Sequence, residues 1–347
     1  MSTMRSGLAR ALLGTSLLLP LFFQPSFGLP GVRQVLPRAS ASPTSSAASA
    51  VVHATAAAST CNGRTEYCSR SYSNVTFVGS HDSAFVGNTL SDNQNIDVTA
   101  QLDMGIRFLQ GQTHHALLDD SVLELCHTSC LLEDAGTLES YLSTVKDWLD
   151  ANPNEVVTLL LTNGDSVSIT EFGDTFSSAG ITDYAFVPSS NPLSIGSWPT
   201  LGDLISSGKR LVVFLVSQTL TTIFPRVDYG ADTSKVDYIL DEFDYYFETP
   251  YDVTDSSFSN CSIDRPAGAS ASGRMYIVNH FLDVDILGAD VPDRDAASKT
   301  NAVSGTGSIG AQAAECEALY DRAPNAVLAD FVDQGDVIGA QNQMNGF

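Results

Sequence analysis

Val156-Val-Thr-Leu-Leu-Leu161 and Leu211-Val-Val-Phe-Leu215 are two almost uninterrupted apolar runs, and they decide the fold class of this chain. Runs of this length that are rich in β-branched residues are typical of parallel strands covered on both faces. Strands of a sandwich alternate apolar and polar residues instead, because one face of each sheet meets water. The two runs therefore favour an α/β fold with a parallel sheet.

Outward from these runs, short apolar segments alternate with helical patterns along the chain. The clearest helix is predicted over 137–150, where apolar residues recur at helical spacing, Asp147 and Asp150 face water, and Asn152-Pro153 ends the pattern. Strands are predicted at 76–79, 106–110, 122–126, 156–162, 210–216, 245–248, 276–280 and 326–332. These are as many strands as a closed barrel requires, so we predict a single, distorted TIM-type (β/α) barrel over 61–347.

The first 60 residues differ in composition from the rest. Arg5 and Arg10 flank an apolar stretch, and Ser26-Phe-Gly28 offers small residues for cleavage, so 1–28 is predicted to be a signal peptide. A signal anchor is the weaker alternative, because the stretch is shorter than the roughly 20 residues that a membrane helix needs. Residues 29–60 are rich in Ala, Ser and Pro and are predicted to be a disordered linker or propeptide. We expect a secreted, extracellular protein.

An even number of cysteines in an exported chain favours disulfides over free thiols. Sequence alone leaves the pairing open, and the pairs that we expect are Cys61–Cys68, Cys126–Cys130 and Cys261–Cys316. Cys126-His-Thr-Ser-Cys130 resembles half of a zinc site, but the second cysteine pair that such a site needs is missing. Asn74-Val-Thr76 and Asn260-Cys-Ser262 are acceptor sequences for N-glycans, consistent with a secreted glycoprotein.

The balance of charges limits the partners of the protein. The chain has 17 Lys and Arg residues against 40 Asp and Glu residues, a formal net charge of -23. Such a surface repels nucleic acid and anionic membranes. We therefore exclude nucleic acid as a partner, expect at most peripheral membrane contact, and expect a monomer.

Val78-Gly-Ser-His-Asp-Ser83 and Leu125-Cys-His-Thr128 each place a histidine just after an apolar run. In a (β/α) barrel the active residues lie at the carboxyl ends of the strands, which puts His81 and His127 at its mouth. One imidazole can take a proton while the other gives one, because a pKa near 6.5 leaves both states available around neutrality. Asp82 and the distant Asp330 are candidate carboxylates for orienting the two rings.

With these residues in place, the chain resembles the phosphatidylinositol-specific phospholipase C X-domain superfamily, particularly its secreted bacterial type and fungal relatives. The resemblance covers 72–345 and is carried by Gly79-Ser-His-Asp-Ser83, Gln101-Leu-Asp-Met-Gly-Ile-Arg-Phe-Leu109, Leu125-Cys-His-Thr128 and Val327-Leu-Ala-Asp-Phe-Val-Asp333. It implies that His81 is the general base for the inositol 2-hydroxyl and that His127 is the general acid for the departing diacylglycerol oxygen. It also implies that Asp330 orients His81, that Asp82 orients His127, and that no metal or other cofactor takes part.

The chain departs from this family where the phosphate is expected to bind. Bacterial members carry an Asp and a phosphate-neutralising Arg after the Gly-x-Arg strand, and the calcium-dependent animal enzymes carry acidic ligands there. Here the two positions are Gln110 and Gln112, whose amides donate hydrogen bonds but supply no positive charge and hold calcium weakly. Arg107 is the nearest cation, but strand alternation turns it away from the glutamines, so we expect it in a structural ion pair.

Four residues are predicted to bind the substrate: Gln110, Gln112, Asn163 and His280. The favoured function is a secreted, metal-independent enzyme that cleaves phospholipids or other phosphodiesters, with activity weakened or altered by the missing arginine. One alternative is a catalytically impaired barrel that binds a phosphorylated or sugar ligand. Another is a metal-dependent phosphodiesterase that uses His81, Asp82, His127 and Asp330. His114-His115 is expected in a solvated hairpin, and 217–227 is expected to be an inserted loop of low order.

Overall fold

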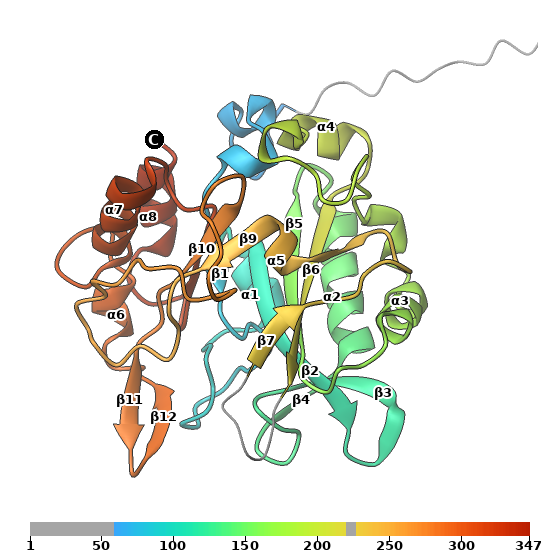
Figure 1. The fold of residues 1–347 in the computed structure, drawn as a ribbon, viewed down its shortest axis with the longest axis horizontal. Helices are drawn as coiled ribbons and strands as arrows, with labels where there is room; N and C mark the ends of the chain where they lie inside the picture. Colours follow the sequence, from blue (N-terminus) through green and yellow to red (C-terminus); the bar gives the residue numbers. More distant parts are fainter. Residues whose placement is uncertain (1–58, 220–226) are drawn as a thin grey trace, which may run out of the picture. The chain divides into compact units, whose positions relative to one another are not determined.

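Eight strands joined by parallel pairing form the centre of the computed structural model (Figure 1). Their order is β8-β6-β5-β2-β1-β13-β10-β9. Their bounds are β1 Phe77–Ser80, β2 Phe108–Ala116, β5 Val157–Asn163, β6 Leu211–Thr219, β8 Ile239–Asp241, β9 Tyr246–Glu248, β10 Met275–Asn279 and β13 Ala326–Ala329. Within the described chain β8 and β9 do not pair, so the ring is open between them. The prediction of a distorted TIM-type barrel is confirmed.

The structure describes residues 59–219 and 227–347, which belong to one compact unit. The predicted signal peptide, nearly all of the predicted linker and most of the inserted loop therefore lie outside the described residues. Among the helices that are described, none is long and apolar enough to cross a membrane.

The prediction that 122–126 is a barrel strand is wrong, because the strand found there belongs to a hairpin outside the barrel. Strand β3, Asp119–Cys126, pairs antiparallel with the outer half of β2, with Thr113 opposite Leu125. It forms a hairpin that extends β2 beyond the barrel and then returns to the barrel mouth. The strand that completes the barrel is β8, which has only three residues and therefore gives almost no periodic signal in the sequence.

The other strands lie around the barrel mouth. Strand β4, Asp134–Thr137, pairs antiparallel with β3, and β7, Val227–Gly230, pairs antiparallel with β6. Strands β11, Asp283–Ile286, and β12, Ala289–Pro292, form a separate hairpin that follows β10. Figure 1 shows this hairpin and the β2–β3 hairpin projecting toward the same lower edge of the view.

Helices follow several strands. They are α1 Val98–Asp103, α2 Leu138–Ala151, α3 Ile169–Ser178, α4 Leu201–Ser206, α5 Glu242–Tyr245, α6 Ala297–Thr300, α7 Ile309–Tyr320 and α8 Val337–Met344, with short 3-10 turns η1 Glu66–Ser69, η2 Tyr72–Asn74, η3 Thr182–Tyr184 and η4 Ile195–Ser197. Helix α2 confirms the prediction over 137–150. The Thr137 hydroxyl accepts a hydrogen bond from the Ser140 amide and caps the helix, as threonine commonly does. Its apolar stripe is buried, while Asp147 and Asp150 are exposed.

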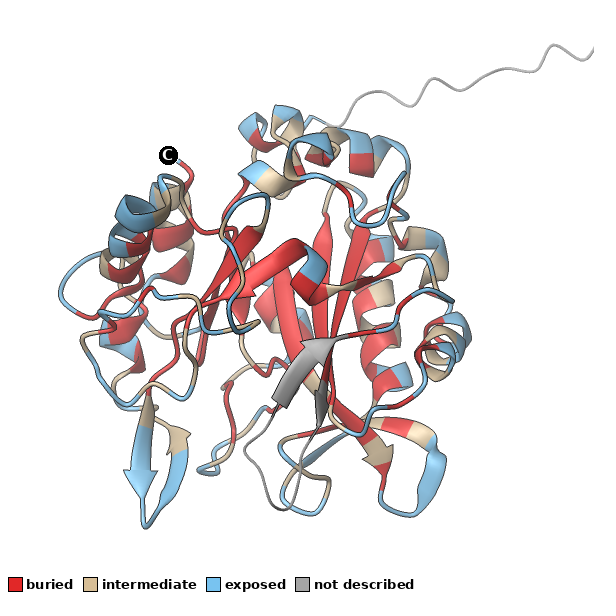
Figure 2. Ribbon diagram, viewed as in Figure 1, coloured by how far each residue is buried: buried red, intermediate tan, exposed pale blue. Residues whose placement is uncertain are grey.

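The continuous apolar runs are explained by two cores on opposite faces of the sheet. Val157, Leu159 and Leu161 of β5 pack in one cluster with residues of α2 and α3. Leu160, between them in sequence, packs in a second cluster with Phe214 and other residues of the barrel interior. Every residue of β5 is buried, as the red central strands of Figure 2 illustrate. The strict alternation of apolar and polar residues is lost because both faces of the strand are buried.

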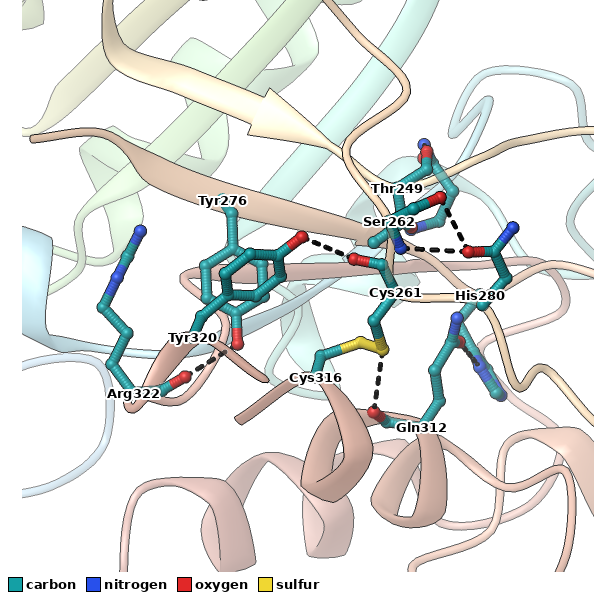
Figure 3. The surroundings of a disulfide bond; sticks show 11 residues. Thr249, Cys261, Ser262, Tyr276, His280, Gln312, Cys316, Tyr320 and Arg322 are labelled. Carbon is teal, nitrogen blue, oxygen red and sulfur yellow. Dashed lines mark hydrogen bonds between the residues drawn. A yellow bond between two sulfur atoms is a disulfide. The ribbon is translucent and has the colours of Figure 1, made fainter. Parts of the chain in front are cut away.

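All three predicted disulfides are confirmed: Cys61–Cys68, Cys126–Cys130 and Cys261–Cys316. The last one connects the segment that follows β9 to helix α7 (Figure 3). There the Tyr320 hydroxyl donates a hydrogen bond of 2.6 Å to the carbonyl of Cys261.

Arg107 lies behind the barrel wall, as predicted. Its Nε donates to Glu155 at 2.8 Å, and its guanidinium lies 4.5 Å from the ring centroid of Trp148. Its Nη1 donates to the carbonyls of Leu102 and Ile106. Arg107 is therefore part of the scaffold and does not line the cavity described below.

We expect Arg107→Met to lower the free energy of unfolding by about 3 kcal/mol, because removing one partner leaves the Glu155 carboxylate without its cation in a mostly buried position. Urea denaturation measures the change. The matched control is Lys146→Met, which breaks the more exposed pair with Asp150 and should change the free energy of unfolding far less. Equal losses in the two variants would contradict the structural role of Arg107.

Candidate active site

A cavity of about 250 Å³ opens at the carboxyl ends of the barrel strands. Its floor is formed by strand residues that point into the barrel, among them Leu160, Thr162 and Leu328. Its polar lining comes both from the strands and from the segments that follow them, and includes His81, Asn93, Gln110, Gln112, His127, Glu248, Arg265, Asn279 and Asp283. The two histidines singled out in the sequence therefore share one cavity.

His81 is held from several sides. It follows β1, and its amide donates to the carbonyl of Ala329, which continues the pairing with β13 for one more residue. Its Nδ1 lies 2.9 Å from Asp330 Oδ1, and the Asn93 amide donates to the same oxygen at 3.0 Å. The Phe281 ring stacks on the imidazole with centroids 3.7 Å apart and planes 2° apart. With Nδ1 engaged, Nε2 is the nitrogen left for proton transfer.

The charge of His81 is set by the carboxylates around it. Burial alone would lower the pKa of His81, but Asp82, Asp330 and Asp283 favour the cation and raise the pKa to about 9. In turn, burial and the nearby Asp330 raise the pKa of Asp283 to about 7, although His81 opposes the shift. Near neutral pH the ligand-free site therefore holds an imidazolium within a group of acidic side chains.

His127 comes from the β3 hairpin and reaches the same place from the other side. Its Nε2 lies 3.4 Å from Asp82 Oδ2, and its Nδ1 lies 3.9 Å from Glu133 Oε2. The Phe85 ring packs at a tilt with its centroid 5.2 Å from that of the imidazole. The side chain of His127 is 23% exposed, more than the 15% of His81. His127 is thus the less enclosed of the two histidines.

Asp82 lies between the two rings and is fully buried. Its Oδ2 is 3.5 Å from the Nε2 of His81 and 3.4 Å from the Nε2 of His127. The backbone of Asp82 is left-handed, with φ of 44°, a conformation that aspartate tolerates better than most residues. This turn directs the carboxylate into the space between the histidines.

Gln110 and Gln112 both line the cavity, as predicted, but their side chains form hydrogen bonds with neighbouring groups of the protein. Gln110 Oε1 accepts from the Asp82 amide at 2.6 Å and supports the left-handed turn. Gln112 Nε2 donates to Asp82 Oδ2 at 2.7 Å, and its Oε1 accepts from the Thr128 amide at 3.2 Å. The two amides therefore fix Asp82 and the segment that carries His127.

Asn163 and His280 are not brought into this cavity. The Asn163 side chain exchanges two hydrogen bonds with the backbone of Val167 and lines a separate depression. His280 is fully buried between Gln312 and the carbonyl of Thr300, near the Cys261–Cys316 disulfide in Figure 3. Both follow or end strands, but position along a strand does not show which way a side chain turns.

His114 also differs from its prediction, because it is buried and not solvated. Its Nδ1 lies 3.0 Å from Asp165 Oδ1. His114 belongs to the β2–β3 hairpin and does not line the cavity.

Arg265 is a cavity residue that sequence reasoning missed. It is the one Lys or Arg side chain on the wall of this cavity among the residues that the structure describes. Its guanidinium pairs with Glu248 and lies 4.1 Å from the ring centroid of Tyr251. Asn279 also donates to Glu248, at 2.8 Å, so the arginine is part of a bonded cluster on β9 and β10. Arg265 belongs to an irregular segment between β9 and β10, where no motif marks it.

One cluster of side chains has the spacing of a metal site but not the chemistry. In the described part of the chain, three potential donors converge within 4.8 Å at Glu124, Cys126 and Cys130. Both sulfurs are bonded to each other, so they supply no thiolate for a metal. This cluster therefore does not fit a metal ion.

Comparison with known proteins identifies the family. The PI-PLC X family model (PI-PLC X 1) matches residues 67–345. A PI-PLC X domain-containing protein 1 of Arthroderma benhamiae is 56% identical over 287 residues, covering 82% of this chain and 89% of the relative. An uncharacterized secreted protein of the same fungus is 45% identical, covering 82% of this chain and 62% of the relative. In fold, a mutant of the phosphatidylinositol-specific phospholipase C from Staphylococcus aureus matches with a TM-score of 0.50 and 15% identity, covering 80% of this chain and 93% of that one.

We expect Asp330→Asn to lower the pKa of His81, because it removes a carboxylate that favours the imidazolium. The folded pKa of about 9 lies above the ordinary 6.5, so the pairing stabilises the fold fully below about pH 6.5 and is lost as pH rises through about 9. The stability gap between wild type and variant should therefore close over that interval.

NMR titration of the imidazole and urea denaturation at several pH values measure the two effects. Asp165→Asn is the matched control, since it removes the partner of His114 and should leave His81 unchanged. An unaltered His81 pKa in Asp330→Asn would contradict this account of the site.

Proposed function

Because the chain belongs to the PI-PLC X domain family, we propose that its cavity cleaves a phosphodiester by proton transfer between His81 and His127. The observation that carries the proposal is the convergence of both Nε2 atoms within 3.5 Å of one oxygen of Asp82. A phosphodiester placed there has one imidazole beside the attacking oxygen and one beside the leaving oxygen. Two positioned histidines suit this reaction, since one gives a proton while the other takes one.

The two histidines take opposite roles in the proposed reaction. His81 removes a proton from the attacking hydroxyl as its oxygen bonds to phosphorus, and His127 protonates the alcohol oxygen that departs. Asp330 then stabilises the imidazolium that forms at His81, with which it shares a hydrogen bond of 2.9 Å. Because His81 is protonated below about pH 9 in the free protein, the base form is a minor species near neutrality. The fraction of His81 in the base form should therefore rise with pH up to about that value.

Charge on the phosphoryl group needs a partner now that Gln112 occupies the expected arginine position. In the proposed complex, His127 and Arg265 are the cationic groups available from the cavity wall, and no metal is required. Gln112 Nε2 donates one of its two hydrogens to Asp82 and acts on the reaction through that carboxylate.

We further propose that the substrate is a lipid and that the protein meets it outside the cell. Exposed apolar side chains occur on the segments that follow β1, β2, β3 and β10, which lead to the cavity mouth. They are Val86, Leu90, Leu117, Leu118, Leu131, Leu132, Val284, Ile286 and Leu287. The β11–β12 hairpin is conspicuously exposed in Figure 2. Three disulfides suit an oxidising extracellular medium.

We expect His81→Ala and His127→Ala to lower turnover of phosphatidylinositol vesicles by about 10²-fold or more, because each removes a proton-transfer group. Phosphorus NMR of the products measures the rate and shows whether a cyclic phosphate is released. His115→Ala is the matched control. This histidine lies on the β2–β3 hairpin, pairs with Glu171 of α3, and should be dispensable for turnover. Unchanged turnover in either active-site variant would contradict the proposal.

We expect Leu118→Ser and Leu287→Ser to weaken binding to phosphatidylcholine vesicles by about tenfold each, because each removes an exposed apolar side chain from the rim. Vesicle sedimentation measures the binding, and a neutral lipid avoids repulsion by the acidic protein. Leu319→Ser on α7 removes an exposed leucine away from the rim and should have no effect. Equal binding by all three variants would contradict peripheral attachment through these segments.

The bonded state of the glutamines favours one alternative, a barrel that binds a phosphorylated ligand without turnover. Calorimetry with inositol phosphate separates the two functions, because binding without product identifies the alternative. Gln112→Arg tests it further, since a restored cation should increase turnover if phosphate charge limits the reaction. Loss of activity in excess chelator would instead identify a metal-dependent phosphodiesterase.

A further inference from the structure

The two histidines of the cavity are anchored in different ways. His81 continues β1, a strand with barrel neighbours on both sides, and Phe281 and Asp330 fix its ring. His127 continues β3, which lies outside the barrel between β2 and the largely exposed β4. Barrel packing therefore fixes His81 but reaches His127 only through the hairpin.

The turn around His127 has internal hydrogen bonds, such as that from the Ser129 amide to the carbonyl of His127 at 2.6 Å, but few backbone hydrogen bonds to the barrel. The His127 amide donates to the carbonyl of Glu133 at 3.2 Å, and the Thr128 amide donates to Gln112 at 3.2 Å. Thr128 is exposed and has a left-handed backbone with φ of 62°, and Leu131 and Leu132 are also exposed. Little apolar burial is thus available to hold this turn in one conformation.

One covalent bond closes the segment. Cys126 and Cys130 form a disulfide with a sequence separation of 4, and His127 lies inside this loop. Cys126 is fully buried at the end of β3, while Cys130 is only partly buried. The bond therefore ties the exposed side of the turn to the buried end of the strand, immediately beside the imidazole.

We propose that the Cys126–Cys130 disulfide is a positioning element for His127, which holds its imidazole against Asp82. A short covalent loop removes most of the backbone freedom of the residues inside it. A catalytic group displaced by about 1 Å can lose a factor of about 10² in rate, so this restriction matters to proton transfer. The effect on turnover rests on the proposed function, whereas the effect on the ring does not.

The chain supplies a matched control. Cys61–Cys68 also closes a short loop, with a sequence separation of 7, and its buried half belongs to the cluster in the barrel interior. Neither of its cysteines lines the cavity. Cys126→Ala/Cys130→Ala and Cys61→Ala/Cys68→Ala therefore both remove one local crosslink, but only the first frees His127.

We expect the imidazole signals of His127 to shift or broaden in Cys126→Ala/Cys130→Ala during an NMR titration without substrate, while those of His81 stay unchanged. Turnover should fall about tenfold to a hundredfold, with the part of the pH profile that belongs to His81 retained. The Cys61→Ala/Cys68→Ala variant should leave both histidines and turnover at the wild-type values, whatever its melting temperature.

His127 signals identical to wild type in the first variant would overturn the proposal, as would equal changes in both variants. If the wild type turns over no phosphodiester, the proposed function fails, but the NMR result still decides the role of the disulfide. If Cys126→Ala/Cys130→Ala does not fold, Cys126→Val/Cys130→Ala replaces it, because valine preserves the buried volume at position 126. The same NMR and turnover results are expected for this variant.

Discussion

The buried carboxylate of Asp82 is the interaction on which the rest of the site depends. A charge with no exposure to water is costly unless neighbours compensate it. Gln112 donates to it, and His81 and His127 lie on either side of it. Its other oxygen, Oδ1, has no hydrogen-bond partner among the residues described. The charge of Asp82 therefore favours a proton on His81, and both histidine rings are directed at the same carboxylate oxygen.

This constraint explains the use of the two glutamines. The Gln112 amide is neutral, so it supplies a hydrogen bond to Asp82 and leaves the carboxylate charge to act on His81. Gln110 has a different task, since it stabilises the left-handed turn that aims Asp82. The two amides thus hold Asp82 where its charge raises the pKa of His81.

The sequence predicted those parts of the fold whose residue pattern is compatible with a single kind of structure. The run at 156–161 is nearly continuous in apolar residues, which favours a parallel strand covered on both faces over a sandwich strand with one face in water. The role of β3 was mistaken, because an apolar strand pattern does not show whether the strand pairs in parallel or folds back as a hairpin. Arg265 was missed for a related reason. Its place on the cavity wall depends on an irregular segment, whose path is set by tertiary contacts such as the pairing with Glu248.

The misplaced strand and the chemistry of the site are connected. Had β3 been a barrel strand, barrel strands on both sides would have held His127, as β2 and β13 hold His81. Because β3 returns along the outside of β2, the ring reaches the cavity at the end of a hairpin whose far strand is largely exposed. A short covalent loop at that point restores the rigidity that the barrel cannot supply. The same hairpin carries Leu117 and Leu118 at its tip, so the element that delivers one histidine also extends the apolar rim. Strand β3 therefore joins the exposed tip of the hairpin to His127, and Cys126 is the buried residue at which this strand ends.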